Sequence, residues 1–170
     1  MAKVNRLKKE IKKNKRNSKI NIPILILSFL LVIITATIGS SVTVIDEWYD
    51  SVRPSITPPS IAFPIVWTIL FFMMGLSMYF AWTNTNKKKE KIKIFLLFGI
   101  NYILNVLWSF LFFGIRKPIY AFYEIIVLWI SILVMVIYLR KIDKKASWLL
   151  VPYLLWVSFA SLLTGLVAFA

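Results

Sequence analysis

Long apolar runs alternate with short basic clusters along this chain. Five of the runs approach the roughly 20 residues that a helix needs to cross the hydrocarbon core of a bilayer, and nearly all charged residues lie between them. The runs occupy about residues 22–45, 61–82, 94–114, 119–139 and 147–170. The pattern predicts an all-α integral membrane protein in which residues 22–170 form one domain, a five-transmembrane-helix bundle.

A basic arm precedes the first run. Residues 1–21 hold nine Lys or Arg and a single acid. A basic segment followed by an apolar run also resembles a signal peptide, but this run exceeds the roughly 7–15 apolar residues of such a peptide, and no A-x-A-like cleavage site follows it. We therefore interpret the run as a retained first span. The basic cytoplasmic N-terminal arm before it is suited to lie on anionic headgroups.

The distribution of positive charge predicts the orientation. Eighteen of the 21 basic residues lie in the N-terminal arm and in the connections after the second and fourth spans, whereas the other two connections hold three. Five spans place these two sets of segments on opposite sides of the membrane. Because connections rich in Lys and Arg stay in the cytoplasm, we expect a multi-pass protein of the cell membrane with its N-terminus in the cytoplasm and its C-terminus outside.

The composition limits the catalytic and metal-binding chemistry that the chain can carry out. Hydrophobic residues make up 59% of the chain and charged residues 16%, and the chain has no cysteine and no histidine. Disulfides, thiol nucleophiles, histidine bases and the usual zinc or haem ligands are thereby excluded. We predict no catalytic residue, no metal site and no cofactor. The net charge of +14 follows from the positive-inside rule, so nucleic acid is not an expected partner.

The connection between the first two spans, called loop 1 below, is rich in proline. Pro54, Pro58 and Pro59 fix φ and lack a backbone N–H, so we expect this loop to be ordered but not helical. Trp48 and Tyr49 are typical of the aromatic belt at a membrane interface. The density of prolines instead favours a shaped lid.

The third span places four residues on one helical face. Asn101, Asn105, Trp108 and Phe112 follow one another at spacings of 4, 3 and 4 residues,. An amide in hydrocarbon must find a hydrogen-bond partner. Two outcomes are equally compatible with this pattern: hydrogen bonds between helices, or polar anchors in a ligand pocket.

The last two spans hold further unusual residues. Glu124 is the only acid well inside a span, where such groups face a cavity or a partner unless they reach the membrane interface. Pro152 predicts a kink or a loosened turn in the fifth span. Small residues form two rows there, which we expect to pack within the bundle or, second, to form a homodimer interface: Ala160, Thr164 and Ala168, and Ser161 with Gly165.

The predicted orientation brings several of these residues together. Trp67, Trp108 and Glu124 fall in the outer half of the bundle, and Asn105 and Trp156 fall near its middle. Loop 1 lies on the same side, above them. Polar and aromatic groups that converge beneath one proline-rich loop predict a ligand-binding site.

Several short motifs occur in a characteristic order. They are Trp48-Tyr49, Pro58-Pro59, Phe63-Pro64 with Trp67, Met74-Gly75, Asn101 with Asn105-x-x-Trp108-Ser109, Phe112-Phe113-Gly114, and Pro152-Tyr153-Leu154-x-Trp156 with Phe159-Ala160. In order and spacing, residues 46–163 resemble the tryptophan-rich sensory protein or translocator protein family, also called the peripheral benzodiazepine receptor or TspO/MBR family.

The resemblance implies a five-helix bundle, often dimeric, with a pocket for porphyrins and synthetic isoquinoline carboxamide or benzodiazepine ligands beneath loop 1. It also implies pocket-lining roles for matched positions, and Glu124 sits where family members often carry an acid. With Phe112 from the third span, the candidate ligand-binding residues are Trp48, Trp67, Asn101, Asn105, Trp108, Phe112, Glu124 and Trp156. The expected partners are a porphyrin or another amphipathic small molecule and the lipid bilayer.

Two departures from the family pattern bear on function. Ile56 and Ile61 stand where family members usually have tryptophan, and an aliphatic side chain offers no π-stacking. This weakens a second hypothesis, that the protein is an enzyme degrading porphyrin in light. A third hypothesis is a membrane scaffold that acts through its basic arm. The leading hypothesis is a membrane-embedded binding protein, sensor or transporter for porphyrins or similar flat ligands.

Overall fold

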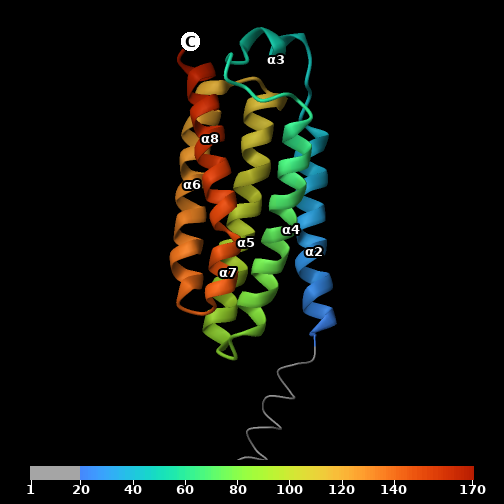
Figure 1. The fold of residues 1–170 in the computed structure, drawn as a ribbon, viewed down its shortest axis with the longest axis vertical. Coiled ribbons are helices and arrows are strands. Elements are labelled where there is room, and N and C mark those ends of the chain that lie inside the picture. The colour runs from blue at the N-terminus through green and yellow to red at the C-terminus, as the bar shows by residue number, and fades with distance from the viewer. Residues whose placement is uncertain (1–19) are drawn as a thin grey trace, which may run out of the picture.

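The computed structural model describes residues 20–170, almost entirely as helices (Figure 1). The predicted basic arm lies outside the described residues except for its last two positions. In chain order the helices are α2 (Ile22–Ser41), α3 (Glu47–Val52), α4 (Ala62–Thr83), α5 (Lys88–Ser109), the π-helix η1 (Phe110–Gly114), α6 (Pro118–Arg140), α7 (Lys144–Leu149) and α8 (Val151–Ala168).

Five segments are long and apolar enough to cross a membrane, which confirms the predicted five-helix membrane bundle. They are α2, α4, α5 with η1, α6, and α7 with α8. The helices stand side by side in a closed ring: α2 packs against α4 and α5, α6 packs against α5 and α8, and α7 joins α4 to α6. Loop 1 with α3 crosses one end of the bundle, the end at which the C-terminus lies (Figure 1).

Large apolar side chains fill the centre of the ring, and apolar side chains also cover its outside. Met74, Phe98, Ile132 and Tyr153 are fully buried. Large aliphatic residues such as Ile103 remain exposed on the outer faces of the spans. A helix that is apolar all round fits a membrane, because lipid tails rather than water cover its outer face.

Two span boundaries differ from the predicted ones by four residues or more. The first helix ends at Ser41, four residues before the predicted position, and α5 begins at Lys88 rather than near residue 94. Lysine is a good helix former, and the first turn of α5 is joined by the ion pair of Lys87 with Glu90. Hydropathy detects the apolar part of this helix and misses its basic first turns.

Loop 1 contains a helix, so the expectation of a wholly non-helical loop is wrong. The Asp46 side chain accepts a hydrogen bond from the backbone N–H of Tyr49, and Glu47 and Asp50 lie in the first turn of α3. Acids at this position favour a helix N-terminus. The helix ends before Pro54, where Arg53 is extended, as expected of a residue that precedes proline.

The fifth span is interrupted where Pro152 predicted a loosened turn. Leu150 separates α7 from α8. Two serine hydroxyls hold the short α7 in place: Ser77 donates to the Ala146 carbonyl at 2.7 Å, and Ser147 donates to the Val136 carbonyl at 2.8 Å. The break therefore sits in a fixed position between α4 and α6.

The rows of small residues in α8 pack largely inside the bundle. Ala160 and Thr164 are buried. A Cβ atom placed on Gly165 would lie 2.9 Å from the Phe122 ring, so only glycine allows this approach of α8 to α6. Of the two uses predicted for these rows, packing within the chain is the one that the structure shows; homodimerisation stays a prediction.

Candidate ligand-binding site

A tyrosine hydroxyl links the two asparagines of α5 near the middle of the bundle. Asn105 Nδ2 donates to the Tyr153 hydroxyl at 3.1 Å, and that hydroxyl donates to Asn101 Oδ1 at 3.3 Å. Asn101 Nδ2 also donates to Ser131 Oγ on α6 at 2.8 Å. The amides thus form hydrogen bonds between helices, one of the two outcomes that their spacing allowed.

The same tyrosine contacts the wall formed by α4. The Trp67 ring lies 6.1 Å from the Tyr153 ring in an edge-to-face arrangement, and the Phe63 ring lies 5.8 Å from the Trp156 ring. Both pairs join α4 to α8. Because the main helical neighbours of α4 are α2 and α7, and that of α8 is α6, these aromatic rings bridge two helices that are otherwise not packed closely together.

A second aromatic cluster lies under loop 1. Trp108 stacks on Phe112 with ring centres 5.5 Å apart, and Trp48 of α3 meets Phe112 edge to face at 5.8 Å. Tyr49 and Phe113 extend the cluster, with ring centres 5.6 Å apart. The structure therefore brings together three predicted site residues, Trp48, Trp108 and Phe112.

The π-helix places Phe112 and the following turn. The Ile115 N–H donates to the Phe110 carbonyl, and the Lys117 N–H donates to the Leu111 carbonyl, both at 2.9 Å. Such wide turns break the regular spacing of 3.6 residues. Phe112 nevertheless stays buried, as its place on the face of Asn101, Asn105 and Trp108 predicted.

Arg116 fastens loop 1 to this turn. Its guanidinium lies 2.6 Å from Asp46 Oδ2 and 5.4 Å from the centre of the Trp48 ring. Arg116 has a φ of 52°, in the left-handed region that costs a non-glycine residue free energy. The contacts to Asp46 and Trp48 offset that cost.

Tyr49 docks α3 onto the bundle. Its ring is buried against Phe113, and this burial raises the pKa of the hydroxyl, although nearby Arg53 lowers it. The phenol therefore stays neutral at physiological pH, and loop 1 brings no extra charge into the aromatic cluster.

Several buried polar atoms have no hydrogen-bond partner within residues 20–170. They are Trp108 Nε1 on α5, both carboxyl oxygens of Glu124 on α6, Trp156 Nε1 on α8 and Thr57 Oγ1 in loop 1. Glu124 is only 7% exposed. Leaving such a group unpaired costs about 1–3 kcal/mol, and more when it is charged, so each of these atoms calls for an explanation.

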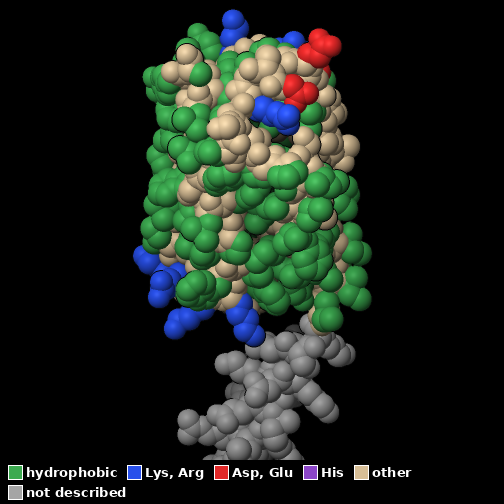
Figure 2. Space-filling model, turned by 45° about the horizontal axis from the view of Figure 1, so that its top comes forward, with side chains coloured by type: hydrophobic (Ala, Val, Ile, Leu, Met, Phe, Trp, Pro, Cys, Tyr) green, Lys and Arg blue, Asp and Glu red, His purple; other side chains and the backbone are tan. Residues whose placement is uncertain are grey.

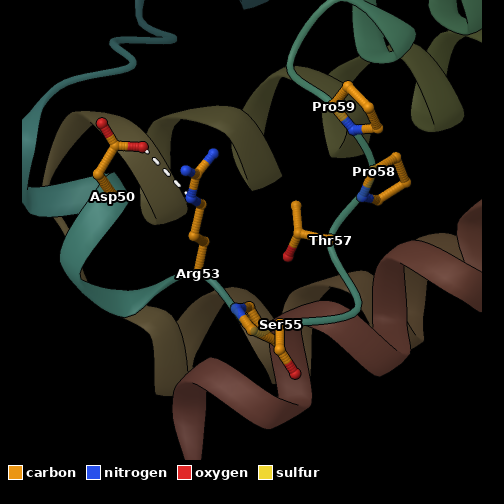
Figure 3. Close-up of a pocket in the computed structure, with 7 residues that line it drawn as sticks. Asp50, Arg53, Ser55, Thr57, Pro58 and Pro59 are labelled. Carbon is orange, nitrogen blue, oxygen red and sulfur yellow. Dashed lines mark ion pairs between the residues drawn. The ribbon is translucent and has the colours of Figure 1, made fainter.

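A cavity of about 360 Å³ opens in loop 1 itself (Figure 3). Asp50, Arg53, Pro54, Ser55, Thr57, Pro58 and Pro59 line it, and none of the predicted site residues does. Arg53 Nε lies 3.3 Å from Asp50 Oδ1 on its wall. Of the side chains predicted to bind ligand, Trp48 belongs to α3 in loop 1, and the other seven belong to the membrane-spanning helices. Among residues 20–170, no acidic cluster could hold a metal ion.

Sequence reasoning omitted two residues that organise this region. Tyr153 belongs to a matched motif, but nothing in the spacing showed that its hydroxyl would face two asparagines of another span. Arg116 could have been found: the predicted topology places its turn on the same side as loop 1, where Asp46 offers the opposite charge.

The chain matches known proteins over most of its length. The model of the TspO/MBR family matches residues 26–169. The tryptophan-rich protein TspO of Chlorobaculum tepidum is 44% identical over 120 residues, which cover 69% of this chain and 75% of that protein. The protein of the same name from Archaeoglobus fulgidus is 38% identical over 84% of this chain and 94% of its own length.

An animal protein is also similar. The translocator protein of Ovis aries is 30% identical over 119 residues, which cover 69% of this chain and 70% of that protein. The residues that the family model matches, 26–169, include the spans that carry the asparagines, the aromatic clusters and the unpaired polar atoms. On the strength of these matches and of its five-span bundle, this chain belongs to the TspO/MBR family.

Proposed function

We propose that this protein senses or transports porphyrins or similar flat amphipathic molecules, which it binds in the outer half of the bundle beneath loop 1. Membership of the TspO/MBR family supports a membrane sensor or transporter role. The nature of the ligand is inferred from the residues of the site.

The unpaired polar atoms carry this proposal. Trp108, Glu124 and Trp156 come from three different helices, and each buries a polar atom that has no partner in the described part of the chain, residues 20–170. Indole N–H groups donate, whereas a carboxylate accepts. A ligand that satisfies all three must combine acceptors and donors on an apolar body. A porphyrin has this chemistry: pyrrole nitrogens of both kinds, carboxylate side chains and a flat ring that stacks on indole.

The proposed orientation puts loop 1 outside the cell and the connections α4–α5 and α6–α7 in the cytoplasm. Within residues 20–170, nine Lys or Arg belong to those two connections or the adjoining helix ends, and three belong to the opposite end. The positive-inside rule assigns the first group to the cytoplasm of a cell membrane. The binding site then faces the outer leaflet.

Titration of the purified protein with protoporphyrin IX tests the proposal. We expect saturable quenching of tryptophan fluorescence and a shift of the porphyrin absorption band. Trp108→Phe keeps an aromatic ring but removes the unpaired N–H, so we expect about a tenfold loss of affinity, equivalent to the roughly 1.4 kcal/mol of one hydrogen bond. Trp148→Phe is the matched control, because Trp148 is exposed on α7. Absence of saturation, or equal effects of the two substitutions, would overturn the proposal.

A further inference from the structure

The end of the bundle opposite loop 1 concentrates positive charge. Figure 2 shows blue side chains gathered around this end, beneath an otherwise apolar surface. The connections α4–α5 and α6–α7, with the helix ends beside them, contribute Lys87, Lys88, Lys89, Lys91, Lys93, Arg140, Lys141, Lys144 and Lys145, against the acids Glu90 and Asp143.

Both acids are already engaged inside the protein. Glu90 pairs with Lys87 at 3.0 Å and accepts a hydrogen bond from Thr85. Asp143 accepts the Asn84 side-chain N–H at 2.6 Å and caps α7 through the Ala146 N–H at 2.8 Å. Within residues 20–170, the other eight bases of this end therefore form no ion pair.

Three of these bases lie at the adjacent ends of α5 and α6, which pack side by side. Lys93 Nζ lies 5.9 Å from the centre of the Tyr138 ring, so Lys93 of α5 and Tyr138 of α6 lie at the same depth in the bundle. Lys89 lies one turn earlier on the same face of α5, and Lys141 lies three residues after Tyr138 at the end of α6. Lys89, Lys93 and Lys141 are exposed; they are called the α5–α6 lysine cluster below.

Apolar side chains continue both helical faces beyond the lysines. On α5, Leu96 and Ile100 follow Lys93 at helical spacing, and both are about half exposed,. On α6, Val134 lies one turn from Tyr138 and is exposed as well. The seam between the helices is therefore cationic at its end and apolar along the rest. A phospholipid has the same arrangement, with a charged headgroup followed by acyl chains.

Aromatic residues mark the depth of this cluster. Lys91 Nζ lies 5.6 Å from the centre of the Trp82 ring, on the α4 side of α5. Tryptophan and tyrosine gather at the level of lipid headgroups, so Trp82 and Tyr138 place the neighbouring lysines at the depth of the phosphates. At that depth a membrane lipid is a better occupant than a soluble acidic protein.

We propose that the α5–α6 lysine cluster binds the phosphate headgroup of an anionic phospholipid, whose acyl chains lie along the seam between α5 and α6. Clustered bases next to membrane spans attract anionic lipids, with about a fivefold gain in affinity for each base near the surface. This site lies at the other end of the bundle from the proposed porphyrin site and does not depend on it.

Native mass spectrometry of the full chain tests the site. The protein is released from mixed micelles that contain phosphatidylglycerol and phosphatidylcholine with identical acyl chains. We expect the protein to retain phosphatidylglycerol selectively, and the triple variant K89Q/K93Q/K141Q to lose at least about tenfold of that selectivity.

A variant with the same loss of charge serves as the control. K88Q/K144Q/K145Q removes three bases from the same end of the bundle but spares the cluster, so we expect a clearly smaller loss of selectivity than in the cluster variant. Equal losses in the two variants would mean diffuse attraction to the whole end and would overturn the site. Unchanged selectivity in the cluster variant would overturn it too. All six lysines are exposed, and far-UV circular dichroism verifies that both variants are folded.

Discussion

The Tyr153 hydroxyl shows how one atom organises the centre of this bundle. It both accepts from Asn105 and donates to Asn101, and its ring contacts Trp67. The sequence alone could predict that Asn101 and Asn105 share a face of α5, because helical spacing is a local property. It could not predict which span would supply their hydrogen-bond partner, because that depends on the order of helices in the ring.

Glu124 is the residue at which stability and binding are expected to conflict. Both of its oxygens are buried, and neither has a hydrogen-bond partner among residues 20–170. Glu124→Leu keeps a side chain of similar size and removes the buried polar atoms, so we expect the free energy of unfolding to rise by about 1–3 kcal/mol. The same change should weaken protoporphyrin binding, because it removes an acceptor from the proposed site.

Thermal unfolding in detergent micelles and porphyrin titration measure the two effects of Glu124→Leu. Glu47→Leu is a suitable comparison, because Glu47 is exposed on α3. It removes an acid from the first turn of that helix, so we expect the free energy of unfolding to fall slightly, by up to about 1 kcal/mol, with no change in porphyrin binding. A Glu124→Leu protein that unfolds at a lower temperature would show that the carboxyl group makes stabilising contacts, and would contradict the prediction.

At the scale of elements, apolar length and proline positions predicted the spans and the break before α8. The misses have local electrostatic causes. Helix α3 forms because Asp46 caps it. Helix α5 begins early because lysine is a good helix former,. Neither segment is apolar. The π-helix η1 has no signal in hydropathy, since its wide turn is visible only in its hydrogen bonds.

The contact between loop 1 and the turn after η1 should control how firmly loop 1 is held on the bundle. Arg116→Gln removes the ion pair with Asp46 and the cation over Trp48. Because both charged side chains are partly exposed, we expect a modest loss of up to about 1 kcal/mol. Hydrogen exchange of the α3 amides should then be up to about fivefold faster, with little change in the spans.

The neighbouring base provides the control for this experiment. Lys117→Gln removes the same charge one residue away, so it should leave exchange in α3 nearly unchanged. High salt should speed exchange in the unsubstituted protein and not in Arg116→Gln, because salt screens an exposed ion pair. Equal exchange rates in the two variants would show that loop 1 is held by its aromatic contacts alone.

At the scale of the whole molecule, the bundle combines a largely apolar core that holds one small hydrogen-bonded network, an apolar outside and two ends of unequal charge. The fold class follows from the sequence because a spanning segment must satisfy its own backbone hydrogen bonds, which leaves few alternatives to the α-helix. The site was predicted less completely. Its candidate residues were proposed from motifs and spacing, and their role in binding stays a prediction, whereas the loop 1 cavity and the Arg116 contact depend on how distant segments meet.

The unequal ends make a direct prediction about orientation. An alkaline phosphatase fused to the C-terminus should be active, because that enzyme folds only outside the cytoplasm, and the basic end should stay inside. A fluorescent protein fused to the N-terminus should be bright for the complementary reason. An inactive phosphatase together with a dark N-terminal fusion would reverse the assignment of the two faces.

Glu124 has an electrical consequence as well. Within residues 20–170 it is the only buried Asp, Glu, Lys or Arg, so it is where a transmembrane voltage can act on a titratable group inside the bundle. Carrying one charge fully across a membrane involves about 2.3 kcal/mol per 100 mV, and a site near one face experiences a fraction of that. Ionisation of this carboxyl group leaves a charge within that field, so the balance between its neutral and ionised forms depends on membrane voltage.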